Sequence, residues 1–380
     1  MLALQRHHLR TQLINTLAAA FLILCILQRI PFGWPPGYDA WSYIAAARAF
    51  IHGQNPTTAP LEQYVPDVTL SWFGQPLSIG AYLYPPVLAL LHMPLAILPF
   101  GVALAIWMSI VAVSAALLVG ALQQLVGRRI ALVACFGFVP LWSSLWLGQI
   151  NTVIALFLTL AVIAARREQP MRLGAWLALG ALLKVTPAVS LLMLMQRRQW
   201  RSIASATLLA AGVVLLTLPI TGMQGWLAGS TAALRVSFDS DALVSLTAYT
   251  FRLPAGYREV ATWGLMFGML GITLLRARQV PLQLALAATI LLPMLIARIT
   301  WDHHTVMALP ALAILWTWSR RGRIMASSAW LALTLSGGIT IPVVLLLCWS
   351  ICCWPSILED RPDDQTAVLL ARLSAARDTA

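Results

Sequence analysis

Acidic residues and lysine are scarce in this chain. Its 380 residues include 13 aspartates and glutamates and a single lysine, and only 10% are charged, whereas a soluble domain usually carries about 25%. Hydrophobic residues make up 60% and the mean hydropathy is +0.81. This excludes an ordinary soluble protein. Apolar stretches long enough to cross a bilayer recur along the chain, so the sequence predicts an integral membrane protein with residues 13–30 as an anchor, not a cleaved signal peptide.

The motifs of soluble catalytic sites are also missing. The sequence contains no phosphate-binding glycine loop and no G-x-S-x-G motif. Its five cysteines lie in apolar segments without the spacing of a zinc site, so we expect them to be small buried hydrophobic residues. We therefore expect no metal and no cofactor, and any chemistry must use a membrane-embedded cavity with a few polar groups.

The net charge of +12 comes from small basic clusters between apolar runs. A single basic stripe would favour nucleic acid, whereas scattered clusters act as topology signals, so no nucleic acid is expected. The positive-inside rule makes their side of the membrane cytoplasmic. The clusters are Arg6/Arg10, Arg128/Arg129, Arg166/Arg167/Arg172, Arg197/Arg198/Arg201, Arg276/Arg278 and Arg320/Arg321/Arg323. The other side then receives Asp39, Glu62, Asp67, Asp239, Asp241, Glu259 and Asp302.

The pattern of apolar stretches predicts an all-α polytopic membrane protein with about nine to eleven transmembrane helices. Residues 173–195 differ from the other stretches, because basic clusters flank both ends and Pro187 interrupts the middle. They predict a re-entrant or broken hairpin, which is tolerated where protein or a cavity surrounds it. The candidate spans are 13–30, 101–125, 130–147, 151–165, 202–220, 256–275, 281–297, 304–318 and 326–354.

A single membrane domain is expected over residues 1–354, followed by a polar tail over 355–380. Its first extracytoplasmic loop, residues 31–100, is long enough to carry a function. A helix opening at Asp39 should place Tyr43, Ala47, Phe50 and Ile51 on one face and Arg48 and His52 on another, which is typical of a helix lying in the membrane interface. A second short helix is expected over residues 86–98, which are too few to span.

Lys184, in "GALLKVTP", lies inside the predicted hairpin. A charge in an apolar segment is costly, so it is by default a functional hypothesis with an anionic partner. The alternative is a lysine that extends to the interface or pairs structurally with a carboxylate.

Asp302 and His303, in "TWDHHTV", are expected at the extracytoplasmic mouth of a helix. A metal site is disfavoured, because adjacent histidines on a helix diverge by roughly 100°. The alternative to a site here is Asp302 as a helix cap, with the histidines packed in the headgroup zone.

Two further stretches carry polar groups. Gln149 and Asn151 lie on one face in "WLGQINTVIA", where a tight turn between helices would also explain them. "SLTAYTFRL" offers Ser245 and Arg252, whose guanidinium could bind a phosphate through two hydrogen bonds.

Taken together, these stretches resemble glycosyltransferase family 87, polytopic enzymes of the GT-C class that use polyprenyl-phosphate sugars as donors. The resemblance runs in order through "YDAWSYIAAARAFIHGQNP" (38–56), "YLYPPVLALLHMPLAILP" (82–99), "LGQINTVIALFLTLA" (147–161), "ALGALLKVTPAVSLLMLMQRRQWR" (178–201), "SLTAYTFRL" (245–253) and "WDHHTVMALPAL" (301–312).

The resemblance implies an inverting transfer of a monosaccharide, mannose by similarity, from a polyprenyl-phosphate donor to a lipid-linked or cell-envelope glycan acceptor. Asp39 matches the expected general base, and capping of its helix is the alternative explanation of this aspartate. The enzyme would lie in the plasma (inner) membrane, among membrane lipids, with its site on the extracytoplasmic side. The residues expected to bind donor phosphate or substrate are Lys184, Arg252, Arg298, Ser245, Asp302, His303, Gln149, Asn151 and Tyr84.

Two other functions are compatible with the sequence. A transporter or lipid-linked-sugar flippase would also be polytopic, although transporters tend to have repeated halves and ionisable groups at mid-membrane. A non-catalytic assembly subunit would give no reason for a lone hairpin lysine opposite a loop carboxylate.

Overall fold

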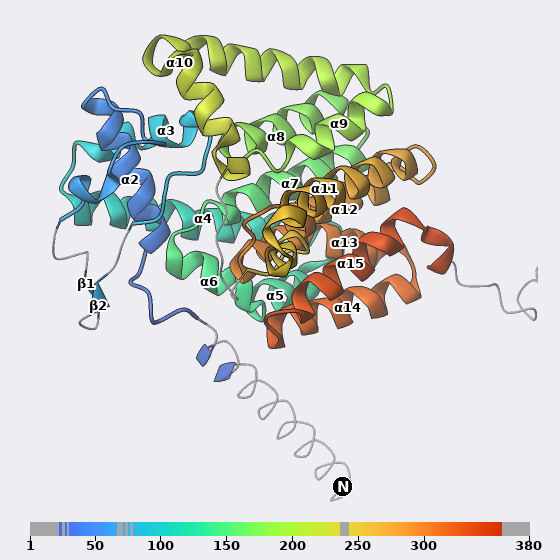
Figure 1. Cartoon of the computed structure of the whole chain (residues 1–380). Helices are drawn as coiled ribbons and strands as arrows, with labels where there is room; N and C mark the ends of the chain where they lie inside the picture. Colours follow the sequence, from blue (N-terminus) through green and yellow to red (C-terminus); the bar gives the residue numbers. More distant parts are fainter. Residues whose placement is uncertain are drawn as a thin grey trace, which may run out of the picture.

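The computed structural model describes residues 23–24, 27–28, 30–66, 71–72, 75–76, 79–235 and 243–358. These residues are almost entirely helical (Figure 1). The strands among them are the short antiparallel pair β1 (Ser71–Trp72) and β2 (Gln75–Pro76), in which Ser71 is opposite Pro76. Most of the expected anchor over 13–30 and of the polar tail over 355–380 lies outside the described residues.

The helices follow one another along the chain with short connections. They are α2 (Tyr38–Ile51), η1 (Leu61–Tyr64), α3 (Pro86–Ala96), α4 (Phe100–Val126), α5 (Arg128–Phe136), α6 (Val139–Leu147), α7 (Asn151–Arg166), α8 (Pro170–Leu183), α9 (Ala188–Gln196), α10 (Trp200–Arg235), η3 (Thr247–Arg252), α11 (Ala255–Ala277), α12 (Leu282–Ile296), η4 (Asp302–Ala308), α13 (Leu309–Trp318), α14 (Arg320–Leu335), α15 (Thr340–Cys353) and η5 (Pro355–Ile357).

Long apolar helices make the chain an all-α polytopic membrane protein, as predicted. Within the described residues, α4, residues 200–234 of α10, and α11 are each long and apolar enough to cross a membrane. The bent pair α5 and α6 would make a fourth span. Further apolar helices of 10–17 residues, among them α7, α8, α12 and α15, lie between them. The total of nine to eleven crossings stays a prediction, as does the single domain over 1–354.

Two stretches predicted as continuous spans are each broken into two helices. Residues 130–147 form α5 and α6, which meet at an angle of 59°. A side chain at Gly137, between them, would collide with Trp330. The next residue, Phe138, has extended backbone angles, φ −94° and ψ 102°, which interrupt the helix. The stretch 326–354 is divided at residues 336–339, where Ser336 has extended backbone angles, φ −112° and ψ 159°, that end α14.

The hairpin over 173–195 is broken, as predicted. Helix α8 ends at Leu183 and α9 begins at Ala188. Lys184 has extended backbone angles, φ −152° and ψ 126°, so its side chain leaves the helix at the break. Pro187, which disfavours a helical conformation in the preceding residue, accounts for the interruption.

Helix α2 differs from the surface helix predicted for the first loop. It begins at Tyr38 rather than Asp39 and packs against α3 and α4 (Figure 1). Most of its residues are buried, on both predicted faces of the helix. Arg48 donates hydrogen bonds to the carbonyl oxygens of Tyr64, Ala96 and Leu98 at 2.8, 3.1 and 3.1 Å. Periodicity alone does not distinguish a polar face toward headgroups from one toward backbone carbonyls, and the place of α2 at the membrane interface stays a prediction.

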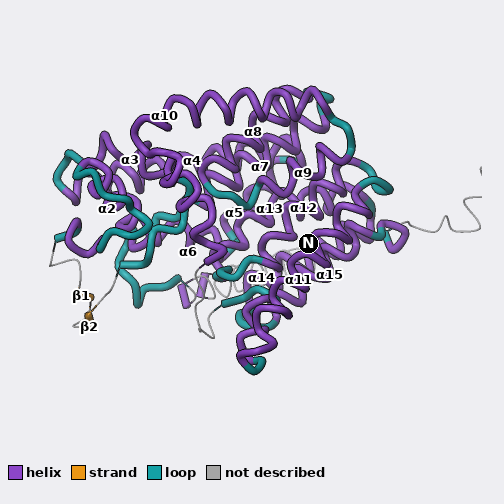
Figure 2. The backbone as a smooth tube through the Cα atoms, turned by 45° about the horizontal axis from the view of Figure 1, so that its top comes forward, coloured by secondary structure: helices purple, strands orange, loops and turns teal. Residues whose placement is uncertain are grey.

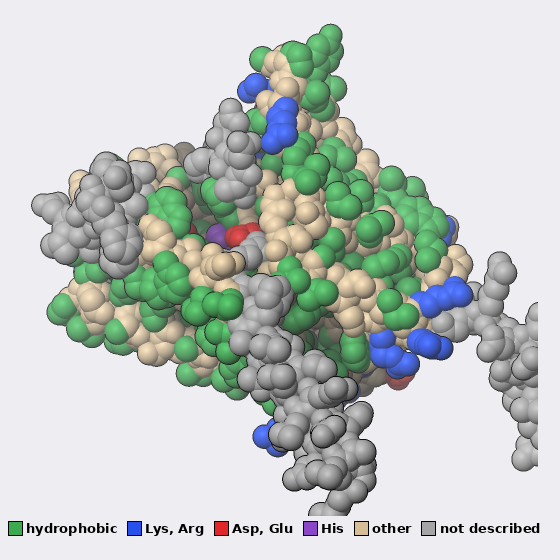
Figure 3. Space-filling view, turned by 90° about the horizontal axis from the view of Figure 1, so that it is seen from below, with side chains coloured by type: hydrophobic (Ala, Val, Ile, Leu, Met, Phe, Trp, Pro, Cys, Tyr) green, Lys and Arg blue, Asp and Glu red, His purple; other side chains and the backbone are tan. Residues whose placement is uncertain are grey.

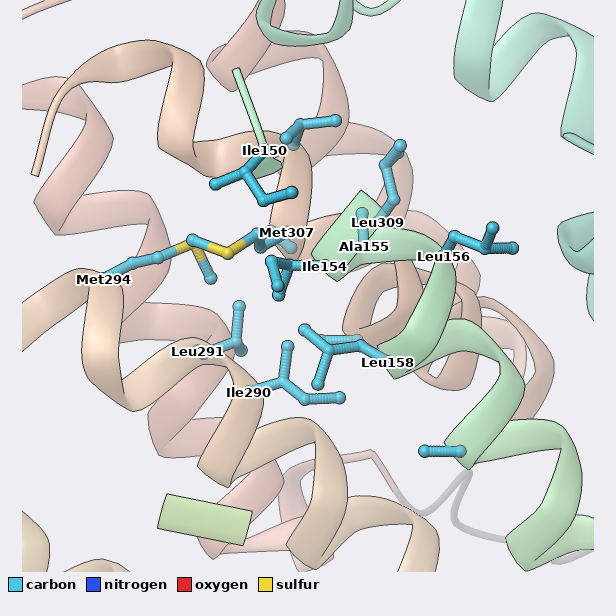
Figure 4. Packing of buried hydrophobic residues seen from close by; sticks show 14 of the residues in the cluster. Ile150, Ile154, Ala155, Leu156, Leu158, Ile290, Leu291, Met294, Met307 and Leu309 are labelled. Atoms are coloured by element: carbon cyan, nitrogen blue, oxygen red, sulfur yellow. The ribbon is translucent and has the colours of Figure 1, made fainter. Parts of the chain in front are cut away.

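The core that supports the centre of the molecule is formed by α7, α12, η4 and α13, which lie together in the middle of the bundle (Figure 2). Ile154 and Leu158 of α7 pack toward Ile290 and Met294 of α12 (Figure 4). Ile150, just before α7, is also buried at this core. The turn that precedes α7 therefore packs on the close-packed apolar side chains of this core.

Helices α8 and α10 approach each other closely, and a substitution at their contact can test this. A methyl group at Gly174 would lie 1.9 Å from the carbonyl oxygen of Ser202. We expect Gly174→Ala to force the two helices apart and to lower the free energy of unfolding by roughly 1–3 kcal/mol. The measurement is thermal unfolding of the purified protein in detergent.

The matched control is Gly212→Ala in α10, where an added methyl group meets no atom within 4 Å. Alanine at position 212 should raise the free energy of unfolding by up to about 1 kcal/mol, because alanine favours a helix more than glycine does. An unfolding temperature of Gly174→Ala equal to that of the wild type would contradict the close helix contact.

Candidate active site

The carboxylate of Asp39 points away from the start of its own helix and toward another segment. The N-cap of α2 is Gly37, with φ 73°, and no side chain caps the helix. Asp39 Oδ2 instead accepts a hydrogen bond from Gln149 Nε2 at 2.6 Å. The capping explanation of Asp39 is therefore wrong, because this carboxylate bonds to a residue 110 positions away in the sequence.

The start of α2 is held against the end of α6. The Gly37 amide donates to the Trp146 carbonyl at 2.7 Å, and the Trp146 indole donates to the Trp34 carbonyl at 2.9 Å. A side chain at position 37 would collide with Leu104, in addition to the left-handed backbone there, so glycine suits this position. These bonds place the first turn of α2 beside the turn between α6 and α7.

That turn carries Gln149 and Asn151. Gly148 ends α6 in a left-handed conformation, as a tight turn requires. Asn151 Nδ2 donates to Gln149 Oε1 at 3.3 Å, and Lys184 Nζ donates to Asn151 Oδ1 at 2.7 Å. Lys184, Asn151, Gln149 and Asp39 thus form one hydrogen-bonded chain from the only lysine to the loop carboxylate.

Two tyrosines complete this network. The hydroxyls of Tyr43 and Tyr84 lie 3.1 and 3.4 Å from Gln149 Oε1 and 3.2 Å from each other. Lys184 Nζ lies 5.8 Å from the centre of the Tyr84 ring, in cation–π range. Sequence reasoning proposed Tyr84 but missed Tyr43. Its position one helical turn after Asp39 was the available signal, since residues i and i+4 share a helix face.

His303 lies between the two carboxylates of the site. Its Nε2 is 3.9 Å from Asp39 Oδ2, and its Nδ1 is 3.6 Å from Asp302 Oδ1. The Ser144 hydroxyl donates to the His303 carbonyl at 2.9 Å, which ties η4 to α6. Asp302 is the first residue of η4 and accepts a hydrogen bond from the His303 amide at 2.7 Å, so it both stabilises this turn and faces the imidazole.

Burial among protein atoms raises the pKa of Asp39 above the usual value for an aspartate. The charge of His303, the hydrogen bond from Gln149 and the charge of Lys184 oppose this rise, in that order. The Asp39 side chain keeps 27% of its surface accessible. The result is a more basic carboxylate that solvent or a ligand can still reach.

This cluster lies at an open part of the molecular surface. Figure 3 shows a hollow on the face seen from below, in which acidic and histidine side chains are visible among hydrophobic residues. A ligand entering this hollow would meet carboxylate and imidazole groups beside hydrophobic side chains.

Three other predicted site residues make different contacts. Arg298 forms an ion pair with Glu259 and lies 5.2 Å from the centre of the Trp263 ring. Ser245 is buried and shares a hydrogen bond of 3.0 Å with the Thr247 hydroxyl.

Arg252 stacks on Tyr249 at 5.1 Å from the ring centre. Its helix, η3, belongs to a region that joins the site through backbone contacts. The Val244 amide donates to the Thr300 carbonyl at 2.7 Å, two residues before η4. The region with Ser245, Arg252 and Arg298 is therefore next to the segment that supplies Asp302 and His303.

In the described part of the chain, no three His, Cys, Asp or Glu side chains are grouped so that they could hold a metal ion. The cysteines that the structure describes, Cys135, Cys348, Cys352 and Cys353, are buried and unpaired, as expected; Cys25 lies outside the described residues. The absence of a metal and of a cofactor stays a prediction.

The geometry joins one accessible carboxylate of raised pKa, that of Asp39, to the amine of Lys184 through the hydrogen bonds of Gln149 and Asn151. Such a pair can remove a proton from a hydroxyl and stabilise negative charge on a leaving group.

Comparison with known proteins gives two curated relatives. A polyprenol-phosphate-mannose-dependent alpha-(1-2)-phosphatidylinositol pentamannoside mannosyltransferase of Mycolicibacterium smegmatis is 27% identical over 365 residues, covering 85% of this chain and 82% of that protein. A polyprenol-phosphate-mannose-dependent alpha-(1-2)-phosphatidylinositol mannoside mannosyltransferase of Mycobacterium tuberculosis is 29% identical over 205 residues, covering 49% and 46%.

The profile of glycosyltransferase family 87 matches residues 82–335. The match begins after Asp39 and includes Tyr84, Gln149, Asn151 and Lys184, as well as η4. Because it covers more than half of the chain and agrees with the resemblance seen in the sequence, the chain belongs to glycosyltransferase family 87.

Proposed function

We propose that this glycosyltransferase moves mannose, with inversion, from a polyprenyl-phosphate donor to a lipid-linked acceptor, with Asp39 as general base and Lys184 near the donor phosphate. The observation that carries the proposal is the hydrogen-bonded chain from Lys184 to Asp39. The relatives are named for a polyprenol-phosphate-mannose donor and for phosphatidylinositol mannoside acceptors, and the proposal takes its donor and acceptor class from them. Transport of a lipid or a lipid-linked sugar finds no support in the family or in these relatives.

The proposed reaction is a single displacement at the anomeric carbon of the donor sugar. The acceptor oxygen forms a bond to that carbon, while the bond from the carbon to the phosphate oxygen breaks and its electrons leave with the polyprenyl phosphate. Asp39 takes the acceptor proton. A correctly placed general base contributes roughly 10²–10⁴-fold to the rate. Because the reaction is a single displacement, the configuration of the anomeric carbon is inverted.

Each charged group has a separate task in this reaction. Lys184, in its protonated form, would balance the charge that builds on the departing phosphate. Arg252, Arg298 and Ser245 are proposed to extend donor binding from the neighbouring region, and Asp302 and His303 to line the reacting end of the site. The raised pKa of Asp39 favours catalysis, because a more basic carboxylate accepts the acceptor proton more readily.

We propose that the site faces the extracytoplasmic side of the plasma membrane. Asn151 lies at the first residue of α7 and Arg166 at its last. Arg166 and Arg167 donate to Thr317 and Gln124, near the last residues of α13 and α4. A basic cluster and the proposed site thus lie at opposite ends of α7, and with the positive-inside rule this supports a site outside the cytoplasm.

Cysteine labelling in intact cells tests this orientation. Glu62 is exposed in η1, in the first loop, and Arg172 is exposed near the start of α8, in a basic cluster. An impermeant thiol reagent should modify Glu62→Cys and leave Arg172→Cys unmodified until the cells are opened. The reverse pattern would invert the topology.

The variant Asp39→Asn tests the general base. It should fold and bind donor normally, because the carboxylate does not cap α2 and the asparagine side-chain oxygen can still accept the bond from Gln149. Turnover should fall by roughly 10²-fold or more, since an amide cannot take the proton. Steady-state transfer assays on purified protein measure this.

Asp39→Glu provides a further check on geometry, as a displacement of about 1 Å can cost roughly 10²-fold. Glu62→Gln, an exposed acidic residue of the same loop, is the control and should transfer at the wild-type rate. Wild-type turnover in folded Asp39→Asn would end the catalytic interpretation.

The variant Lys184→Met tests the donor-phosphate role. Methionine approximately keeps the length of the side chain and removes the charge, so affinity for the donor should fall while the protein still folds. Direct binding of polyprenyl-phosphate mannose and thermal unfolding are the two measurements. Arg201→Met, at an exposed arginine of α10, is the control for loss of a positive charge. Normal donor binding by Lys184→Met would make this lysine a purely structural residue.

A further inference from the structure

The side-chain oxygen of Gln149 is surrounded by hydrogen-bond donors. Tyr43, Tyr84 and Asn151 all present a hydroxyl or amide group to Oε1, at 3.1, 3.4 and 3.3 Å. The side-chain nitrogen of Gln149 lies on the other side, 2.6 Å from Asp39 Oδ2. Gln149 is itself 3% exposed, so water does not compete for these positions.

This arrangement permits one orientation of the amide. If the amide turned over, its oxygen would face the Asp39 carboxylate, which accepts hydrogen bonds but cannot donate them when ionised. The NH₂ group would meet the Asn151 amide, which also donates. The donors around Oε1 thus aim the NH₂ group of Gln149 at Asp39.

The donors are held rigidly. Tyr43 is completely buried, and its ring packs against those of Tyr84, His92 and Trp107 at 5.1, 5.5 and 5.9 Å between centres. The Trp107 indole donates to the Gly148 carbonyl at 2.8 Å, which fixes the turn that carries Gln149. Burial raises the pKa of Tyr43 well above its usual value, so its hydroxyl stays protonated.

The two oxygens of Asp39 are therefore not equivalent. Oδ2 receives Gln149 and faces His303. Within the part of the chain that the structure describes, no hydrogen bond engages Oδ1 of Asp39. Because 27% of the side chain is accessible, this oxygen is the one available to an incoming hydroxyl.

We infer that Gln149, held by Tyr43, is a positioning residue that fixes the Asp39 carboxylate so that Oδ1 is presented to the acceptor hydroxyl. This inference rests on the proposed role of Asp39 as the base, and it replaces the direct contact with substrate that the sequence suggested for Gln149. The bond from Gln149 also stabilises the ionised carboxylate, so its loss should make Asp39 harder to deprotonate.

Other titratable groups lie around Asp39 or its partners. They are Tyr38 and Tyr43 on α2, Tyr84 from the first loop, Lys184 from the break after α8, and His303 with Asp302 on η4. A test must therefore change Gln149 or one of its donors and leave Lys184, His303 and Asp302 in place.

The variants Gln149→Glu and Tyr43→Phe meet this requirement. Gln149→Glu keeps the shape and replaces the NH₂ donor by an oxygen beside Asp39, so the two carboxyl groups must share a proton. The acid limb of the pH profile of kcat/KM should move upward by roughly one unit or more. At neutral pH kcat should fall by about 10–100-fold with little change in the KM for polyprenyl-phosphate mannose.

Tyr43→Phe removes one donor to Oε1 and keeps the ring packing. It should shift the acid limb in the same direction and lower kcat by several-fold. Tyr82→Phe is the matched control, because Tyr82 is an equally buried tyrosine that bonds to the Pro85 carbonyl and the Ala89 amide, not to Gln149. Its pH profile should coincide with that of the wild type.

Three results would overturn the inference. An unchanged pH profile with a raised KM in Gln149→Glu would mean that Gln149 binds the substrate directly. A normal kcat per folded molecule in Gln149→Glu, together with lower thermal stability, would mean that Gln149 only stabilises the turn before α7. Equal shifts in Tyr43→Phe and Tyr82→Phe would show a general effect of buried hydroxyls.

The background variant Asp39→Asn separates this inference from the proposed function. If Gln149 acts through Asp39, adding Gln149→Glu to Asp39→Asn should cost little further activity, because the two effects are coupled. If Asp39→Asn alone retains turnover, the proposed base is wrong. If Asp39→Asn is inactive while Gln149→Glu keeps the wild-type kcat and pH profile, only the positioning role fails.

Discussion

The hydrogen bond from Gln149 to Asp39 joins the long first loop to the helical core. On one side of it, α2 and α3 pack as a buried unit and present the carboxylate. On the other, the turn before α7 lies on the apolar side chains shown in Figure 4. A site assembled from segments so distant in sequence needs both sides to be rigid, and close-packed cores provide that rigidity.

Polar groups in such surroundings are costly unless they bond to one another. Lys184 donates to Asn151, Asn151 to Gln149 and Gln149 to Asp39, so each step satisfies a buried donor and an acceptor. His303 Nε2, by contrast, is buried and has no hydrogen-bond partner. Together with the accessible edge of Asp39, this leaves unused hydrogen-bonding capacity beside the Asp39 carboxylate.

The membrane setting explains why the chain uses few charges and places them at helix ends. Most of the membrane-spanning part of α10 is exposed and apolar, as expected of a helix that meets lipid. Arginines near the helix ends bond to backbone carbonyls of neighbouring segments; Arg197, for example, bonds to the carbonyls of Ala277 and Val280. Such contacts satisfy carbonyls that a helix end leaves without partners.

The sequence by itself determined the class of the protein and the position of most helices. The ends of α4, α7 and α11 agree with the predicted spans within a few residues, because hydrophobic length is a local property. The break at Lys184 was likewise predictable from Pro187. The ordered motifs also identified the family and named most of the polar residues that meet at Asp39.

Only the tertiary structure decided what those residues do to one another. It packed α2 against α3 and α4 and showed that Asp39 bonds to Gln149 instead of capping its helix. It also revealed Tyr43 as a partner of Gln149. Sequence periodicity shows which face of a helix carries a side chain, but the direction of a hydrogen bond depends on where a distant segment packs, and that is set by the whole core.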